Sequence, residues 1–173
     1  MNRGLIEKTL RETWGTTLLF GCALFLAEGL LAYALPTFQE EISSAWLRLG
    51  IIQGRLLALL WAEIGETFGP GIFSAVPWVH PVPLTIVWAH AIILSSRFPA
   101  GEVDRGTVDV LLGLPVSRFQ VYLSETLVWL ASVIVLSGLL VLGNLLGTLA
   151  SRDGRPLAMD VVAAIVTNFI FLH

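Results

Sequence analysis

Residues 102–118 read Glu-Val-Asp-Arg-Gly-Thr-Val-Asp-Val-Leu-Leu-Gly-Leu-Pro-Val-Ser-Arg and form a polar, charge-rich segment between two long apolar stretches. The apolar stretch before this segment covers about residues 80–96, and the one after it covers 118–150. Long apolar stretches of this kind are typical of membrane helices, and a charged segment between two of them is typical of an aqueous loop. The organisation of the whole chain follows from this division.

Local signals in this segment predict a short helix, a proline break and then a long helix. Thr107 is a residue type that caps helix N-termini, and Gly113 and Pro115 are typical of a helix end. Ser117 and Gln120 have the spacing of a capping box, which opens the second helix.

The short helix has one apolar face. Val108, Leu111 and Leu112 occupy positions i, i+3 and i+4, which share one side of a helix. Charged residues surround this stripe: Glu102, Asp104, Arg105 and Asp109. A stripe with a charged rim is suited to a groove on a partner, although the same pattern would fit a solvated cap between two helices.

Composition indicates a membrane protein. The chain has 173 residues, of which 55% are apolar and 13% are charged, and its mean hydropathy is +0.81. These values lie outside ordinary soluble usage, and the apolar residues are clustered in long runs. The net charge of -3 argues against nucleic acid as a partner. The single cysteine, Cys22, excludes a disulfide framework, and we interpret it as a small buried apolar residue.

We therefore expect an all-α integral membrane fold forming one domain over 1–173. The expected elements are an interfacial helix over 1–13, a first span over 14–35, an extracytoplasmic amphipathic loop over 37–75, a second span over 80–96, a polar loop over 97–117, a third span over 118–150 and a partial fourth span over 157–173. Pro36 is expected to end the first span. The fourth run has about 16 residues, fewer than the roughly 20 that a span needs.

The stretch over 37–75 is apolar but also charged. Its ionisable residues include Arg48, Arg55, Glu63 and Glu66. Because a charge at mid-bilayer costs roughly 2.5–3.5 kcal/mol, we expect one or two helices on the outer face. A span over 42–64 is the alternative, and it would place the 102–118 segment outside the cell.

The polar segment resembles a family signature. Glu102, Arg105-Gly106-Thr107, Leu111-Leu112 and Pro115-Val116-Ser117-Arg118 are similar to the E-x-x-R-G-T … L-L … P-V-S-R signature of type-2 ATP-binding-cassette (ABC) transporter permeases. The resemblance extends more weakly over the whole chain. It implies a permease subunit whose cytoplasmic loop docks on a separate ATP-binding subunit, and a second permease chain that completes the pathway. Such permeases have six spans, so we interpret the chain as an N-terminal part, a truncated product or a subunit completed by a partner.

The resemblance also implies which residues contact and couple to the ATP-binding subunit. They are Glu102, Arg105, Gly106, Thr107, Leu111, Leu112, Pro115 and Arg118. It places the chain in a prokaryotic inner (plasma) membrane, with an unknown transported substrate. Six arginines and lysines fall on the side of the N-terminus against four on the other side, which favours a cytoplasmic N-terminus and a cytoplasmic 97–117 loop.

Several polar residues and glycines lie within the expected spans. Glu28 lies deep in the first span, where a lone carboxylate is expensive, and is a candidate for a pathway or gating role. His90 has no second ligand at i+3 or i+4, which disfavours a metal site. Asn144 and Asn168 are expected to make hydrogen bonds between helices, and Gly143 and Gly147 to allow close helix packing.

Two other function classes compete with a permease. An intramembrane enzyme is disfavoured, because the chain has no His-Glu-x-x-His and no Gly-x-Ser-x-Gly motif, and its aspartates lie in loops or at their edges. A membrane anchor that recruits an ATPase without transporting is the stronger alternative. We expect no catalytic residue, cofactor or metal in this chain, with ATP hydrolysis in the partner.

Overall fold

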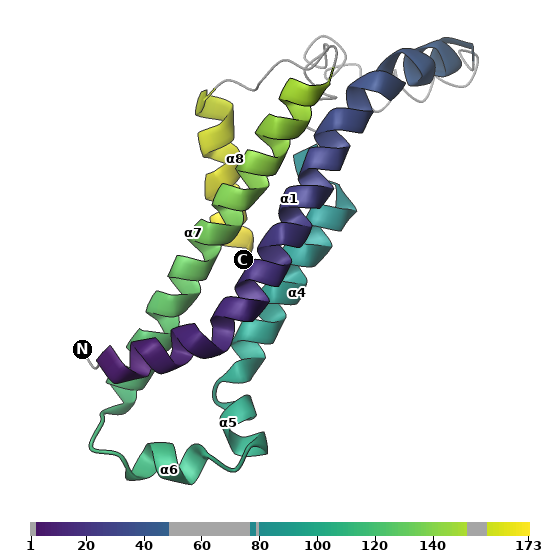
Figure 1. Cartoon of the computed structure of the whole chain (residues 1–173). Coiled ribbons are helices and arrows are strands. Elements are labelled where there is room, and N and C mark those ends of the chain that lie inside the picture. Colours follow the sequence, from purple (N-terminus) through teal and green to yellow (C-terminus); the bar gives the residue numbers. More distant parts are fainter. Residues whose placement is uncertain (1–2, 49–76, 79, 152–158) are drawn as a thin grey trace, which may run out of the picture.

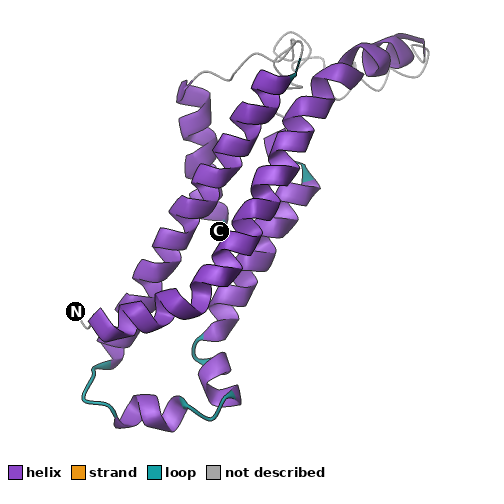
Figure 2. Ribbon diagram, in the orientation of Figure 1, coloured by secondary structure: helices purple, strands orange, loops and turns teal. Residues whose placement is uncertain are grey.

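The computed structural model describes residues 3–48, 77–78, 80–151 and 159–173, and each element in these ranges is an α-helix (Figure 2). The helices are α1 (Arg3–Arg48), α4 (Pro81–Arg97), α5 (Ala100–Asp104), α6 (Val108–Gly113), α7 (Arg118–Ala150) and α8 (Met159–Leu172). The all-α class expected from the sequence is therefore confirmed for the described residues.

The long helices form a bundle around α1. α1 packs against α7 along one side and against α4 along another, and α8 packs on α7 (Figure 1). A small apolar core joins all four helices, through Leu24, Val87, Leu136, Leu140 and Phe169. Trp78 completes this core from the segment before α4.

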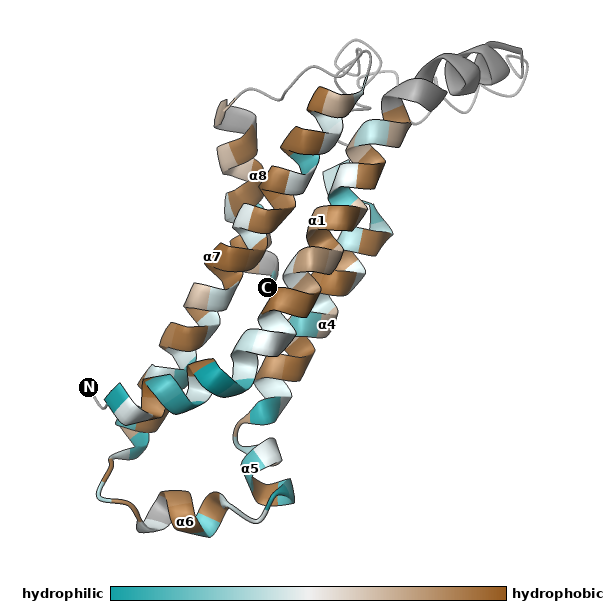
Figure 3. Cartoon of the chain, in the orientation of Figure 1, coloured by the Kyte–Doolittle hydropathy of each residue, from teal (hydrophilic) through white to brown (hydrophobic). Residues whose placement is uncertain are grey.

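The outer surface of the bundle is also apolar. Large side chains such as Leu19, Leu30 and Ile134 point away from the core and are exposed. Within the described residues, two helices are long and apolar enough to cross a membrane, namely the Arg3–Leu35 part of α1 and the whole of α7. Figure 3 shows the hydrophilic residues gathered toward the end of the bundle that carries the N-terminus.

α1 differs from the expected arrangement of an interfacial helix, a span and a stop at Pro36. The structure has one continuous helix from Arg3 to Arg48, so Pro36 does not end the helix, although the part apolar enough to cross a membrane ends at Leu35. Proline in a helix interior removes one backbone hydrogen bond and bends the helix without having to end it. The blue end of α1 in Figure 1 bends away from the bundle.

The first turns of α1 also run at an angle to the rest of the helix (Figure 1). The Thr13 hydroxyl donates a hydrogen bond to the Thr9 carbonyl oxygen, at 2.9 Å, and Gly15 follows. Back-bonding of this kind bends helices, and glycine weakens them locally. Residues 3–13 are thus a differently directed start of α1 and not a separate helix.

The later helices lie close to their expected ranges. α4 begins at Pro81 after the cap His80, whose Nδ1 accepts a hydrogen bond from the Val82 N–H. α7 covers Arg118–Ala150, and the capping box between Ser117 and Gln120 is confirmed. α8 lies within the expected partial span, whereas α5 was not expected. The proposed outer-face helix falls mainly on 49–76, outside the described residues.

Glycines allow the backbones of α1 and α7 to touch. A Cβ atom at Gly143 would overlap the backbone of Phe25, and one at Gly147 would overlap the backbone of Gly29. A Cβ at Gly29 would lie 3.2 Å from the Gly143 carbonyl oxygen. The expected close-packing face at Gly143 and Gly147 is therefore confirmed, and it belongs to the contact between α1 and α7.

We expect Gly143→Ala to destabilise the bundle by about 1–3 kcal/mol, because the new methyl group forces the two backbones apart. Gly138→Ala is the matched control on α7, since a Cβ there meets nothing within 4 Å. This control should be neutral or stabilising by up to about 1 kcal/mol through helix propensity. Thermal unfolding in mild detergent measures both variants, and equal stability would contradict the close contact.

Candidate functional site

The segment between α4 and α7 forms a turn beyond the end of the bundle. α5 follows α4 closely, α6 lies across the lower end, and the chain then enters α7 through an extended stretch at Leu114–Ser117 (Figure 1). We call residues 97–118 the polar turn. It contains every residue assigned to ATPase coupling from the sequence.

The join between α5 and α6 explains the Arg105-Gly106-Thr107 sequence. The Thr107 N–H donates to the Glu102 carbonyl oxygen and the Gly106 N–H donates to that of Val103, both at 3.0 Å. These two bonds form a Schellman motif, whose residue after the helix cap adopts the left-handed conformation. Gly106 has φ +67°, which costs about 1–2 kcal/mol for a residue with a Cβ atom.

The Glu102 carboxylate is the centre of the polar turn. The residue is only 3% exposed, and its Oε1 accepts hydrogen bonds from Lys8 Nζ at 2.8 Å and from Arg105 Nη2 at 3.1 Å. The Thr107 hydroxyl donates to Oε2. The Lys8 hydrogen bond, followed by that of Thr107, lowers the pKa of Glu102 below 4.5, so the carboxylate is charged at neutral pH.

A second cluster of charged side chains lies next to Glu102 and its partners. The Arg97 guanidinium donates to Glu125 Oε2 at 3.1 Å and also to the Glu12 carboxylate. The Thr9 hydroxyl donates to Glu125 Oε1 at 2.9 Å. Because Lys8 Nζ is 3.8 Å from Glu12 as well as bonded to Glu102, the two groups join into one network that touches α1, α4, α5 and α7.

A cavity of about 250 Å³ opens next to this network, between α1, α4 and α7. Its polar wall includes Thr9, Arg97 and Glu125, and its aromatic wall includes Tyr122 and Trp129.

The structure brings four of the eight assigned coupling residues together. Glu102, Arg105, Gly106 and Thr107 make the Schellman turn and its carboxylate contacts. Thr107 is the N-cap residue of α6, as predicted, but its side chain makes no capping bond and contacts Glu102 instead.

The other four coupling residues lie apart from that cluster. Leu111 is half-buried, whereas Pro115, just before α7, and Arg118, the first residue of α7, are exposed. The side chain of Leu112 lies outside the described residues.

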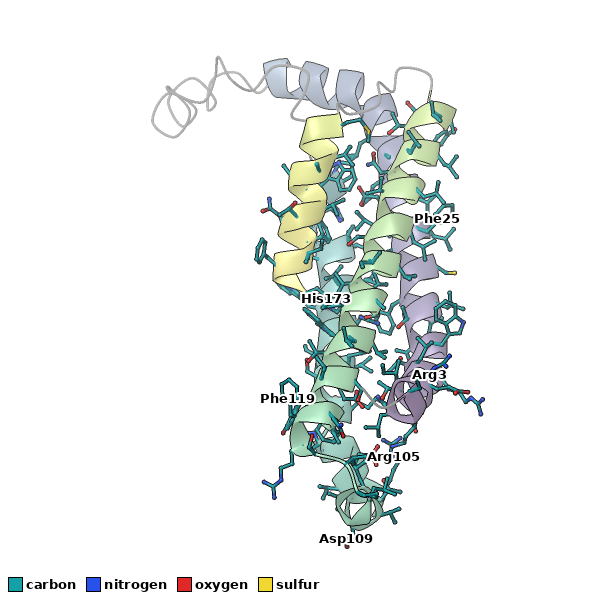
Figure 4. The ribbon with its side chains drawn as sticks, turned by 90° about the vertical axis from the view of Figure 1, so that its left-hand side faces the viewer. Arg3, Phe25, Arg105, Asp109, Phe119 and His173 are labelled. Carbon is teal, nitrogen blue, oxygen red and sulfur yellow. The ribbon has the colours of Figure 1, made fainter. Side chains whose placement is uncertain are left out.

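The most exposed apolar side chains at α6 are not those of the expected stripe. Val108 and Leu111 are half-buried, whereas Val110 is 68% and Leu114 is 46% exposed. Periodicity shows which residues share a face, but the way α6 lies on its neighbours decides which face points outward. Figure 4 shows Arg105 on the side of the polar turn toward the start of α1 and Asp109 at its far tip.

The sequence did not predict the partners of Glu102, nor the cluster formed by Arg97, Glu12 and Glu125. Lys8 and Glu102 are 94 residues apart, and Thr9 and Glu125 are 116 apart. The available signal was the position of Glu12, Arg97 and Glu125 near the ends of apolar helices. That position indicates an aqueous interface but no specific pairing.

Glu28 lies in the contact between α1 and α7. The residue is fully buried, and its Oε1 accepts a hydrogen bond from Asn144 Nδ2 at 3.0 Å. The expected interhelical hydrogen bond of Asn144 is thus confirmed. Oε2 of Glu28 has no hydrogen-bond partner among the described residues, which is unusual for a buried carboxyl oxygen.

His90 on α4 contacts a second histidine, His173, which follows α8. Its Nδ1 lies 2.7 Å from His173 Nε2, and its Nε2 lies 3.3 Å from the Thr17 hydroxyl. Within the described residues, no group of three or more His, Cys, Asp or Glu side chains gathers as a metal site would require. Cys22 is exposed on the bundle surface, so its interpretation as a buried residue was wrong.

Protein-family models, curated proteins and solved structures were each compared with the chain, and none of them matches it. The family resemblance therefore depends on the residues of the chain itself, chiefly those of 102–118.

We expect Glu102→Gln to destabilise the folded chain by about 1.5–3 kcal/mol at pH 7, because it replaces a charged acceptor of three side-chain hydrogen bonds. The folded pKa lies below 4.5, so the carboxylate stabilises the fold above about pH 4.5. That contribution is lost as the pH falls through the folded pKa.

The stability difference between wild type and Glu102→Gln should therefore shrink below pH 4.5 in denaturant unfolding. Glu7→Gln is the control, since the Glu7 side chain is 74% exposed and should change stability by less than about 0.5 kcal/mol. A difference that stays constant from pH 7 to pH 3 would contradict the role of the charged carboxylate.

Proposed function

We propose that this chain is the membrane-spanning permease subunit, or its N-terminal part, of a type-2 ABC transporter. The observation that carries the proposal is the 102–118 signature, whose residues Glu102, Arg105, Gly106 and Thr107 build one preorganised turn. A turn held in this way loses little conformational freedom when a partner binds it. The partner in this proposal is a separate ATP-binding subunit that hydrolyses ATP, while the permease performs no covalent chemistry.

The membrane orientation is part of the same proposal. The outward apolar side chains of α1 and α7 suit lipid, and α7 has 33 residues, about 50 Å, which exceeds a bilayer core of about 30 Å. α4 has 17 residues, about 26 Å, which is close to that thickness. α8, with 14 residues, is shorter. The excess of lysine and arginine on the side of the N-terminus supports a cytoplasmic N-terminus and a cytoplasmic polar turn, in an inner (plasma) membrane.

The docking surface in this proposal is the outer side of α6. Val110 on α6 and Leu114, directly after its last residue, offer exposed apolar contacts, and Asp109 precedes Val110. A short helix of this kind can insert into a groove of the ATP-binding subunit. Movement of that subunit then passes through the extended stretch around Pro115 into α7. A second permease chain completes the membrane pathway.

We expect Val110→Asp to weaken the complex with the ATP-binding subunit at least tenfold, equivalent to about 1.4 kcal/mol, because a charge would enter an apolar groove. Val110→Leu, which keeps the site apolar, should bind like wild type. Co-purification from detergent followed by a binding titration measures both. An unchanged complex with Val110→Asp would exclude this face, and a wild-type complex that supports no transport would favour the anchor alternative.

We further propose a pathway or gating role for Glu28. A buried ionisable residue in a spanning helix is expensive and is a functional candidate by default. Its single side-chain hydrogen bond, from Asn144, leaves Oε2 available for another contact. The carboxyl group also lies beside the glycines where α1 and α7 touch, so helix separation would expose it.

Glu28→Gln should keep the bond from Asn144 and leave unfolding stability within about 1 kcal/mol, because the amide has the same shape. We expect permease-stimulated ATP hydrolysis in proteoliposomes to fall at least fivefold, since the carboxyl oxygen is lost. Glu7→Gln, on the same helix but exposed, is the control for the assay. A normal hydrolysis rate in Glu28→Gln would exclude the pathway role.

A further inference from the structure

We infer that Lys8 and Glu102 are positioning residues that join the first turns of α1 and the polar turn into one rigid unit, so that α1 receives the movement of the docked ATP-binding subunit directly. The inference rests on the proposed function and adds a second route to the one through Pro115. It assigns a transmitting role to the amphipathic start of the chain.

The first step is the stiffness of the polar turn itself. The Schellman bonds fix Glu102 relative to Gly106 and Thr107, and the Thr107 hydroxyl also holds the Glu102 side chain. The Glu102 carboxylate therefore moves with the start of α6. A displacement of α6 by a partner displaces this carboxylate without passing through a flexible link.

The second step is the salt bridge that links the Glu102 carboxylate to α1. Lys8 Nζ lies 2.8 Å from Glu102 Oε1, and the Glu102 side chain is 4% exposed. If Lys8 is removed, Arg105 and Thr107 remain as partners but no charged side chain of α1 does. A carboxylate buried to this degree strongly favours keeping its cationic partner.

The third step is the set of ion pairs that holds the first turns of α1 to the rest of the bundle. Arg97, whose side chain is 13% exposed, contacts Glu12 on α1 and Glu125 on α7. Thr9 adds a hydrogen bond to Glu125, and Lys8 approaches Glu12. Ion pairs shielded to this extent are screened less by salt than surface pairs are. The start of α1 is thus bound to α4, α5 and α7 through side chains.

The fourth step is transmission along α1, from its first turns to its contact with α7. The helix is continuous from Arg3 to beyond Glu28, and it touches the α7 backbone at Gly29, Gly143 and Gly147. The bend near Thr13 lies between the first turns and this contact, but the helix is continuous through it, so a displacement of the first turns still reaches the contact. By comparison, the route through Pro115 begins in an extended stretch whose Leu114 and Pro115 side chains are exposed.

The test uses the full chain reconstituted with its ATP-binding partner in proteoliposomes. Lys8→Glu places a negative charge against Glu102, whereas Lys8→Arg keeps the positive charge. Arg11→Glu is the matched control, because Arg11 lies on the same helix, is 82% exposed and has its ion pair with Glu7 on that helix, at 3.6 Å. We expect Lys8→Glu to co-purify with the partner like wild type but to lose at least fivefold in permease-stimulated ATP hydrolysis. Lys8→Arg and Arg11→Glu should stay within twofold.

A distance measurement tests the rigid unit without the partner. Nitroxide labels at Arg11→Cys and Asp104→Cys, in a Cys22→Ser background, report the separation between α1 and α5. We expect one narrow distance distribution with Lys8 present and a broad one in Lys8→Glu. Identical distributions, or equal ATP hydrolysis in Lys8→Glu and Arg11→Glu, would overturn the inference. A wild-type chain that binds no ATP-binding subunit would overturn the proposed function instead, and the distance measurement would still test the rigid unit.

Discussion

Direct backbone contact between α1 and α7 is the constraint on which the rest of the structure depends. Gly29, Gly143 and Gly147 lack the Cβ atoms that would hold the two helices apart. The contact brings Glu28 against Asn144 in the same interface. With α7 fixed on one side of α1, α4 occupies another side and α8 packs on α7. The charged ends of α1, α4 and α7 are thereby brought level with one another.

The charged end of the bundle follows from this arrangement. Lys8, Glu12, Arg97 and Glu125 come from three helices and meet where those helices leave the apolar core. Glu102 extends the same network into the polar turn. A single carboxylate therefore has two roles, since it stabilises a Schellman turn locally and binds the turn to α1. This explains why Glu102, Arg105, Gly106 and Thr107 occur together in a short stretch.

Where the structure differs from the sequence-based expectations, tertiary contacts prevailed over local signals. Pro36 was expected to end the first span, but the helix itself continues through it, because one missing backbone hydrogen bond bends α1 without stopping it. Thr107 is the N-cap residue of α6 as expected, but its hydroxyl donates to the buried Glu102 carboxylate and accepts no capping N–H. On α6, packing leaves Val108 and Leu111 of the expected apolar stripe half-buried, while Val110 outside that stripe is exposed.

The sequence by itself determined the features that depend on neighbours along the chain. These are the helical class, the bounds of α7, the capping box at Ser117 and the glycine face at Gly143, each set by propensities and spacings within a few residues. Only the tertiary structure decided the pairing of Lys8 with Glu102 and of His90 with His173. The physical reason is that residues more than 80 apart meet only after the helices pack, and helix packing depends on shape over whole faces and not on local pattern.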